Sequence, residues 1–351
     1  MSTSALSFSD AAAPFDHLLA DVILRSSDNI DFRVFKLFLS LASPVFETMF
    51  GLPQPSEGVD PDGETKDGLP VVPVSEDSKT LDVLLRFCYP STLAEDPSLE
   101  NFTVATEVLE AAKKYSLDAI ERLVSKALFT PEILEIDSFP CFVVARRAGL
   151  REQCALAAEY SLRGPLIPTR FEGIQLISSI DLLTLLTYHQ NCANAVLELQ
   201  TDLTWIRSHY QQDNAITWMF GCGASNGTYG HPDLGRSASG RYSLFGGFGG
   251  NQVPTTWWED FMNDTFMGLR DRPCAQTVEK GAEDAIRKFR RTYPHCTRCP
   301  PVISDGMQDF VKLFKNKVEE ATAKVSFIPF TGCHPQNKTA TLSQVELALE
   351  F

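Results

Sequence analysis

The order of hydrophobic and polar positions near the N-terminus predicts two short strands followed by two helices. Asp21–Leu24 is a β-branched run, and the polar residues 26–29 that follow it are typical of a turn. Phe32–Val34 alternates apolar and polar positions, as a half-buried strand does. From Phe35 the apolar spacing becomes helical, and Ser43–Pro44 then supplies the N-cap and first residue of a second helix.

Helical spacing dominates the next part of the chain. Ser78–Tyr89 carries apolar residues at i, i+3, i+4 and i+7, and a proline follows it. Two further helices are predicted from apolar faces formed by Val104, Val108, Ala111, Ala112 and Tyr115, and by Leu117, Ile120, Val124 and Leu128. Before them, residues 51–70 are predicted to be an acidic, solvated loop insertion, and Leu69–Val74 an edge strand because prolines interrupt it.

The remainder of the chain is predicted to be helical around a glycine-rich linker. Residues 131–210 form a helical stalk, with helices predicted over Ser138–Gly149, Arg151–Arg163 and Ser179–His209. Ten of the 21 glycines fall within 221–250, so 211–255 is interpreted as a linker. Three more amphipathic helices are predicted within 256–330. Residues 1–17 and 331–351 are interpreted as tails.

Composition narrows the function classes. The 351 residues are 44% hydrophobic and 22% charged, which is typical of a globular chain, and the formal net charge of −14 disfavours nucleic acid as a partner. Apolar runs are too short to span a membrane, and the N-terminus lacks the basic residues of a secretory signal. Nine scattered cysteines favour a reducing compartment, cytoplasmic or nuclear.

A spaced set of residues in the first third of the chain resembles a known family. The set runs Asp21-Val22, then Phe32-x-Val34-x-Lys36-x-x-Leu39-x-x-x-Ser43-x-x-Phe46-x-x-Met49-Phe50. It is similar to the opening of a BTB/POZ domain, and Leu52–Pro55 resembles the fungal, basidiomycete-type branch. Phe35 stands where a histidine is common, a difference that affects packing. The resemblance implies an α+β fold with a small sheet over 18–130, followed by a BACK-like stalk and a mostly helical C-terminal region.

The same resemblance implies a function in protein–protein interaction without catalysis. Self-association is expected through the first strand and helix, together with docking to a cullin-type ubiquitin-ligase scaffold as a substrate adaptor. The alternative is a scaffold or transcriptional co-regulator that binds no cullin. Asp21 and Lys36 match family positions that form a charged patch near the dimer interface.

The single C-x-x-C motif is a candidate for a structural zinc site. Cys296 and Cys299 have the spacing of two thiolate ligands, and a closed site needs four. Cys222 is the nearest upstream candidate, but Ser225 stands where a second upstream cysteine would complete the pattern. His231, His295 or Cys274 are alternative fourth ligands. The competing interpretation is a pair of loop thiols without metal.

Three other patterns are weaker. Gly223–Gly227 matches G-x-S-x-G around Ser225, which makes a serine hydrolase a distant alternative, but no strand-to-helix turn is predicted there. Gly246–Gly250 lacks the strand and acidic residue of a dinucleotide site. A local basic cluster is interpreted as a solvated helix face in an acidic protein, in preference to a nucleic-acid contact; its members are Arg287, Lys288, Arg290, Arg291 and Arg298.

Overall fold

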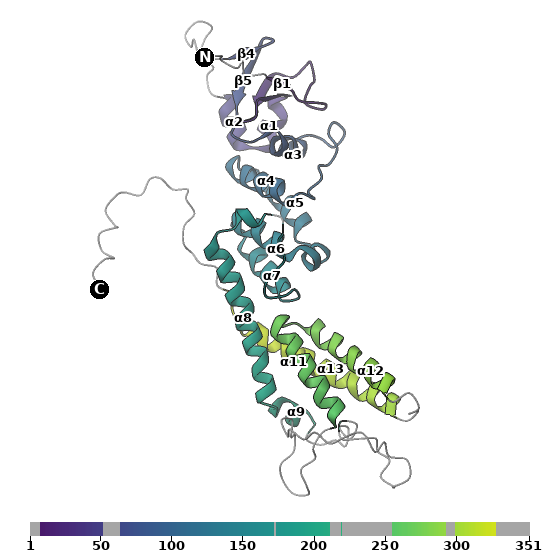
Figure 1. Ribbon diagram of the computed structural model, residues 1–351. Helices are drawn as coiled ribbons and strands as arrows, with labels where there is room; N and C mark the ends of the chain where they lie inside the picture. The colour runs from purple at the N-terminus through teal and green to yellow at the C-terminus, as the bar shows by residue number, and fades with distance from the viewer. Residues whose placement is uncertain are drawn as a thin grey trace, which may run out of the picture.

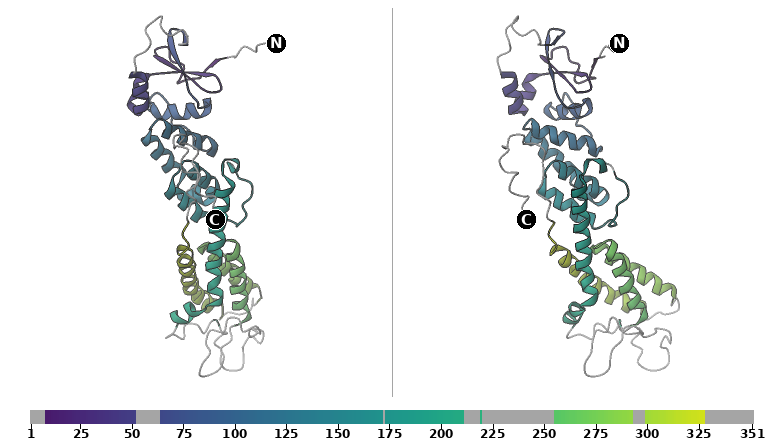
Figure 2. Two further views of the ribbon diagram at one scale, coloured as in Figure 1. Left: turned by 90° about the vertical axis from the view of Figure 1, so that its left-hand side faces the viewer. Right: turned by 60° about the vertical axis from the view of Figure 1, so that its left-hand side comes forward.

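The protein is an elongated row of three packed units. The computed structural model describes residues 8–51, 64–171, 173–210, 219, 255–292 and 299–327, with side chains from 303 onward in the last range. A small sheet and its helices lie at one end, a group of helices follows, and a helical bundle lies at the other end (Figures 1 and 2). The predicted α+β class is confirmed.

The N-terminal unit is built on a five-stranded mixed sheet. Its strands are β1 (Ser9–Asp10), β2 (Val22–Arg25), β3 (Ile30–Val34), β4 (Thr65–Lys66) and β5 (Leu69–Pro73), in the order β1-β3-β2-β5-β4. The central pair β2 and β3 is antiparallel, with Val22 opposite Val34, and β5 runs parallel to β2. All four residues of β2 are buried, because the sheet is covered on one face by helices and on the other by a polar network.

Helices complete the N-terminal core. They are α1 (Lys36–Ala42), α2 (Pro44–Gly51), α3 (Ser78–Cys88), α4 (Phe102–Lys114) and α5 (Asp118–Leu128). The predicted N-cap is confirmed, since the Ser43 hydroxyl accepts from Phe46 N–H at 3.1 Å and donates to the Tyr115 carbonyl at 2.6 Å. Phe46 also stacks on Tyr115 with 4.5 Å between ring centroids. This one corner of the fold therefore joins α2 to α4.

The interpretation of 1–17 as a flexible tail is wrong for its second half. β1 pairs in parallel with β3, and the Phe15 side chain is fully buried. Arg33 N–H donates to the Phe15 carbonyl at 2.9 Å, so the segment is tied to β3 by backbone as well. Isolated apolar residues such as Phe15 carry no periodic signal, and the sequence pattern therefore did not reveal this contribution.

The predicted loop 51–70 is also corrected at its C-terminal end. Residues 52–63 lie outside the described part of the chain, but β4 and β5 form a hairpin closed by Asp67 and Gly68 at φ values of 54° and 77°. Two positive φ angles in a two-residue loop are the signature of a type I′ turn, which favours Asp-Gly. β5 consequently lies between β2 and β4 and is not an edge strand.

The middle unit contains α6 (Pro131–Arg147) and α7 (Arg151–Ser161), with a short 3-10 turn at Ile174–Leu176. Asp137 has non-helical angles, so α6 is two helical segments joined at a kink, and the second begins at the predicted Ser138. Cys141, Phe142, Ala157 and Leu185 lie in the small core of this unit.

The third unit is a bundle that includes part of the predicted stalk. Its helices are α8 (Ser179–Thr201), α9 (Thr204–His209), α11 (Thr256–Asp271), α12 (Ala275–Thr292) and α13 (Cys299–Ala323). Val196, Trp205 and Ile206 share one core with Trp258, Phe261, Met262, Phe310 and Phe314. The boundary predicted between 131–210 and 256–330 is therefore wrong, because α8 belongs to both units.

Two details of the predicted long helix change. Ser178, and not Ser179, is the N-cap, since its hydroxyl accepts from Asp181 N–H at 3.1 Å. The helix ends at Thr201 and a new one begins at Thr204, so no single helix runs to His209. The apolar faces predicted for α11, α12 and α13 are confirmed. Most of the predicted linker 211–255 and the tail 331–351 lie outside the described residues.

Candidate protein-interaction site

Helix α1 carries an apolar face that nothing in the described chain covers. Leu39 points inward and is fully buried, whereas Leu37 and Leu41 are 63% and 79% exposed. These two leucines are four residues apart, so they lie on the same side of the helix. Leu18 and Leu19, in the turn before β2, are 87% and 77% exposed. We call Leu18, Leu19, Leu37 and Leu41 the leucine face.

The two predicted interaction residues meet at the start of α1. An Asp21 carboxylate oxygen accepts from the backbone N–H of Lys36 at 2.8 Å. Phe35, the N-cap of α1, offers no side-chain oxygen, so Asp21, the residue before β2, supplies the missing cap. The Lys36 ammonium lies 5.8 Å from the centre of the Phe50 ring and does not pair with Asp21. Asp21 therefore holds α1, and with it the leucine face, in place.

An aromatic group fixes the other side of α1. Phe35 contacts His17, Phe38 and Tyr89, with ring centroids 5.5, 5.6 and 6.5 Å away. The Tyr89 hydroxyl accepts from Phe35 N–H at 3.1 Å, and burial raises the pKa of Tyr89 to about 12, so the hydroxyl stays protonated. The contact of His17 with Phe35 brings the segment that carries Leu18 and Leu19 close to the start of α1.

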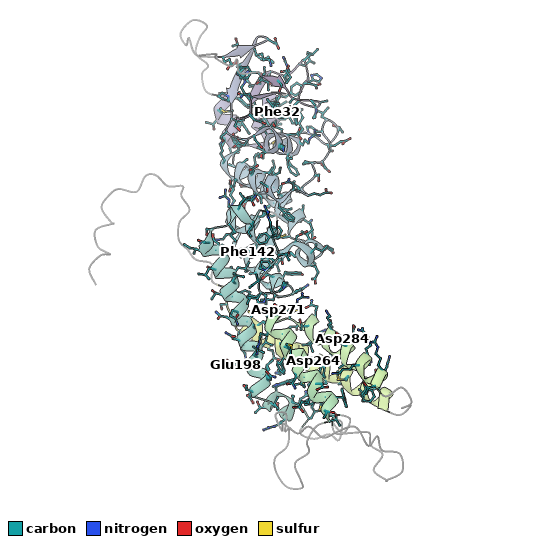
Figure 3. All side chains as sticks on the ribbon, in the orientation of Figure 1. Phe32, Phe142, Glu198, Asp264, Asp271 and Asp284 are labelled. Carbon is teal, nitrogen blue, oxygen red and sulfur yellow. The ribbon has the colours of Figure 1, made fainter. Side chains whose placement is uncertain are left out.

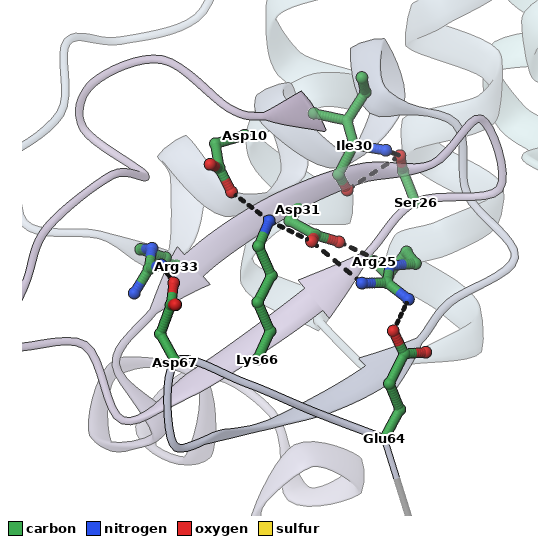
Figure 4. A network of polar contacts seen from close by, with 9 residues as sticks. All are labelled: Asp10, Arg25, Ser26, Ile30, Asp31, Arg33, Glu64, Lys66 and Asp67. Atoms are coloured by element: carbon green, nitrogen blue, oxygen red, sulfur yellow. Dashed lines mark hydrogen bonds and ion pairs between the residues drawn. The ribbon is translucent and has the colours of Figure 1, made fainter. Parts of the chain in front are cut away.

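A polar network covers the sheet near β4 (Figure 4). Asp31 on β3 is fully buried and accepts from the Arg25 guanidinium at 2.6 and 3.0 Å and from the Lys66 ammonium at 2.8 Å. Lys66 also donates to Asp10 at 2.7 Å. Burial opposes ionisation of Asp31, but hydrogen bonds from Arg25 and Lys66 outweigh it and lower the pKa of its carboxyl. Hydrogen bonds to Asp10 and Asp31 raise the pKa of Lys66.

The same network anchors the β4–β5 hairpin. Glu64 pairs with the second side of the Arg25 guanidinium, and Asp67 pairs with Arg33 on β3. These acids were predicted to be part of a solvated loop. They instead attach the hairpin to β2 and β3, so the network has a structural role.

A second candidate surface lies between the N-terminal and middle units. A cavity of about 610 Å³ separates α5 from the start of α7. It is lined by Asp118, Glu121, Arg122, Ser125, Lys126, Phe129, Leu150, Gln153 and Leu156. The Ser125 hydroxyl is buried there and has no hydrogen-bond partner among the described residues. The lining combines four charged side chains with three apolar ones, a mixture that suits a polypeptide partner.

The predicted metal ligands lie largely beyond what the structure describes. Cys222, Ser225, His231, His295 and Cys296 fall outside the described residues. Cys299 begins α13, but its side chain is not among those described. The Sγ atom of Cys274 lies 3.3 Å from the Thr277 hydroxyl oxygen. Within the described ranges, no three His, Cys, Asp or Glu side chains are grouped to hold a metal. The zinc site thus remains a prediction.

The other predicted sites give a mixed outcome. Ser225 and Gly246–Gly250 lie outside the described chain. In the basic cluster, Arg287 and Lys288 pair with Asp284 and Asp260 at 2.7 and 3.1 Å, in the manner of a solvated helix face. No helix in the described ranges has an apolar stretch of the length needed to cross a bilayer.

The leucine face was missed by sequence reasoning, although a signal was present. The segment KLFLSLA is apolar on both sides, which exceeds what one buried face requires. The hairpin acids were missed because a cluster of acids reads as solvent-exposed, and their basic partners lie far away in the sequence.

A comparison with known protein families finds a match to the N-terminal unit. The model of the BTB/POZ domain family matches residues 13–131. This range contains strands β2 to β5 and helices α1 to α5, and it begins after β1. No curated protein matches the chain.

Proposed function

Because residues 13–131 form a BTB/POZ domain, a family of interaction modules, we propose that the protein self-associates through the leucine face and recruits partners without catalysing a reaction. The exposure of Leu37 and Leu41 on a helix fixed by Asp21 carries this proposal. Large side chains are left in solvent on a rigid helix, and a second copy of the same face is the complementary apolar surface that a symmetric dimer supplies.

The energetics favour such a contact. Burying a leucine contributes about 1.5–3 kcal/mol, and a two-fold interface uses every residue twice. The four leucines of one face thus become eight in a dimer, and their burial is of the same order as the entropic cost of association. Asp21 and Lys36 lie at the edge of this face, where their charges would set its orientation.

The test is the mass of the full-length protein in solution, measured by light scattering over a range of concentrations. Leu37→Asp with Leu41→Asp should convert an oligomer to a monomer, with a dissociation constant raised about 100-fold or more. Leu123→Asp, on a 55%-exposed leucine of α5, is the matched control and should leave the mass unchanged. A parent protein that is monomeric at high concentration would overturn the proposal.

A second candidate function is that of a cullin-type ubiquitin-ligase adaptor. The cavity between α5 and α7 supports it, since it offers a polypeptide binding surface on the flank of the BTB/POZ domain, away from the leucine face. The helical bundle would then carry the substrate. The competing function is a cytoplasmic or nuclear scaffold or transcriptional co-regulator that uses the leucine face alone.

A binding titration with a purified cullin N-terminal domain separates these functions. An adaptor should bind with micromolar or tighter affinity, and Leu156→Asp in the cavity should weaken binding at least tenfold. Met267→Asp, on a 70%-exposed residue of the bundle, is the control. Absence of binding by a folded, self-associated protein would favour the scaffold.

A further inference from the structure

A groove follows the pair of helices α11 and α12 on the surface of the bundle. Its cavity has a volume of about 550 Å³, and Arg163 of the middle unit closes one end. The lining residues on α11 run from Thr256 to Asp271, which is the whole helix, so the groove is about 24 Å long. A site of this length suits a segment of polypeptide better than a compact small molecule.

Two glycines form part of the floor of the groove. A Cβ added at Gly268 would lie 2.9 Å from Cγ2 of Thr277, and one added at Gly281 would lie 2.4 Å from the Thr265 hydroxyl oxygen. At both positions a partner can approach the helix backbone, because no side chain stands in its way. Thr265 lines the same cavity and is 1% exposed, and its hydroxyl has no hydrogen-bond partner among the described residues.

The middle of the groove is acidic. Asp260 on α11 reaches Lys288 on α12, with 3.1 Å between oxygen and nitrogen. One helical turn further along both helices, the corresponding residues are Asp264 and Asp284, which line the same cavity (Figure 3). Asp264 makes no hydrogen bond or ion pair within the described part of the chain, and Asp284 pairs with the exposed Arg287 of its own helix. Two facing carboxylates repel each other, so this point favours a cation between them.

The end of the groove nearest the middle unit is basic. Lys280 lies one turn beyond the acidic pair, is exposed, and makes no ion pair with any described residue. Arg163 and Arg272 line the cavity at the same end, where Arg272 is 3.7 Å from the carboxylate of its neighbour Asp271. Three basic side chains against one acidic side chain favour an anionic group here.

The opposite end is aromatic. Trp257 and Phe289 line the cavity there, with their rings edge-on and 5.7 Å between centroids. Trp257 is only partly buried, so an apolar side chain of a partner can reach it. The groove therefore offers three different surfaces in sequence: aromatic, acidic and basic.

We propose that this groove binds an amphipathic helix of a partner protein, whose exposed face carries an apolar, a basic and an acidic side chain in that order. The inference rests on the proposed function, since it assigns to the bundle the surface that receives a recruited partner. A third helix packs along two antiparallel helices as it does within a bundle.

The spacing of the three surfaces fits a helix. Trp257 and Asp264 are about 10 Å apart along α11, and Asp284 and Lys280 are about 6 Å apart along α12. These steps correspond to two turns and one turn of a partner helix. The charge order then fixes the direction in which the partner lies, because a reversed helix would place its acid at the acidic pair.

Fluorescence anisotropy with a labelled peptide tests the proposal on the full-length protein. The probe is a designed helical peptide of about 16 residues, with a leucine, an arginine two turns later and a glutamate one turn after that on one face. The matched peptide has the arginine and the glutamate exchanged. The first peptide should bind at least tenfold more tightly, and this preference should shrink when the salt is raised from about 0.05 M to about 0.5 M. Equal binding of the two peptides, or binding of neither, would overturn the proposal.

Charge reversal in the protein provides the decisive variant. Asp264→Lys with Lys280→Asp should reverse the preference, so that the exchanged peptide binds at least tenfold more tightly than the original. Glu283→Lys is the matched control, because Glu283 is an exposed acid on α12 outside the cavity, and it should leave the preference unchanged. The same change of preference in both variants would show that net charge, and not the groove, selects the peptide, and would overturn the proposal.

Light scattering on the same samples separates this site from self-association. A monomer that binds the first peptide preferentially would support the groove and overturn self-association, whereas an oligomer without peptide binding would overturn the groove alone. A fall in mass on Asp264→Lys with Lys280→Asp would identify a second copy of the chain as the occupant. Equally tight binding of the dipeptide arginyl-glutamate would identify a small zwitterion instead. Either of these last two results would overturn the partner helix.

Discussion

The two ends of the molecule are stabilised by different physical means. The N-terminal sheet contains the ion pair of Arg25 and Asp31, whose two side chains are nearly inaccessible to solvent. The bundle core instead contains large aromatic side chains, among them Trp205, Trp258, Phe261, Phe310 and Phe314. One end depends on directional charge contacts, and the other depends on burial and shape.

The difference follows from the size and shape of the elements. A strand of two residues, such as β1 or β4, buries too little apolar surface to fix its own position, so Lys66 and Glu64 attach β4 to neighbouring strands. Helices of 16 to 25 residues, such as α11 and α13, bring several aromatic side chains each to a common core. Charge specifies position where the contact area is small, and apolar area supplies free energy where it is large.

The largest effect is expected in the aromatic core. Phe310→Ala should lower the free energy of unfolding by about 3–5 kcal/mol, because Phe310 is fully buried against Trp205, Trp258, Phe261 and Phe314. Region-resolved hydrogen exchange should show the loss in α11 and α13 and not in the sheet. Met267→Ala on the exposed side of α11 should cost about 0.5 kcal/mol or less.

The next effect tests the charge contacts. Asp31→Asn should destabilise the N-terminal unit by about 3 kcal/mol, since it leaves Arg25 and Lys66 without their buried anion. Asp10→Asn removes the exposed partner of Lys66 and should cost less than about 1 kcal/mol. The loss of stability in each variant can be measured by chemical denaturation, with hydrogen exchange of the β2 and β3 amides as the readout. If the two substitutions lowered the free energy of unfolding equally, the burial of Asp31 would not explain its contribution to stability.

A smaller effect should come from the close approach of α11 and α12. A Cβ added at Gly281 would lie 2.4 Å from the Thr265 hydroxyl oxygen, so Gly281→Ala should cost about 1–3 kcal/mol despite its better helix propensity. Thr265→Ala should relieve part of that cost, because it removes the oxygen that the new Cβ would contact. Its removal breaks no hydrogen bond among the described residues. A double-mutant cycle with no coupling would argue against steric contact.

The smallest effect is a pH dependence that differs between regions. Burial lowers the pKa of His189, whose Nε2 lies 3.0 Å from the Asp271 carbonyl oxygen at the joint of α8 and α11. The unfolded chain therefore binds a proton below about pH 6.5 that the folded chain does not, and stability falls as the pH drops through that value. Asp31, with its lowered pKa, contributes stability that is lost only below about pH 4. As the pH is lowered, destabilisation should therefore be detected by hydrogen exchange in α8 first, and in β3 only at a lower pH. His189→Phe should remove the first transition.

Periodicity predicted the parts of the fold in which one element buries one face. The strands β2 and β3 and the helices α3, α4, α5 and α11 to α13 follow from it. Periodicity did not predict the segments whose position is set by contacts with residues far away in the sequence. Phe15 is a lone apolar residue, and Glu64 and Asp67 meet Arg25 and Arg33 only in three dimensions. Asp67-Gly68 was a local turn signal that the prediction of a loop passed over.

The candidate site was predicted in part. Asp21 and Lys36 do lie together, but as carboxylate and backbone amide and not as a charge pair. The leucine face could not be found from core spacing, because exposure is defined by what neighbouring elements leave uncovered. The helix α8 could not be assigned to one unit, since a single buried stripe contributes Leu185 to the core of the middle unit and Val196 to the core of the bundle.

The continuity of α8 sets a rotational phase between the two ends of the protein. Its 23 residues form a rod of about 34 Å, with about 100° of rotation per residue. Deleting one residue from its middle would turn the bundle by that angle relative to the leucine face, whereas inserting seven would restore the direction to within about 20° and lengthen the molecule by about 10 Å. In an assembly of several copies, the length and twist of this one helix would decide where each bundle points.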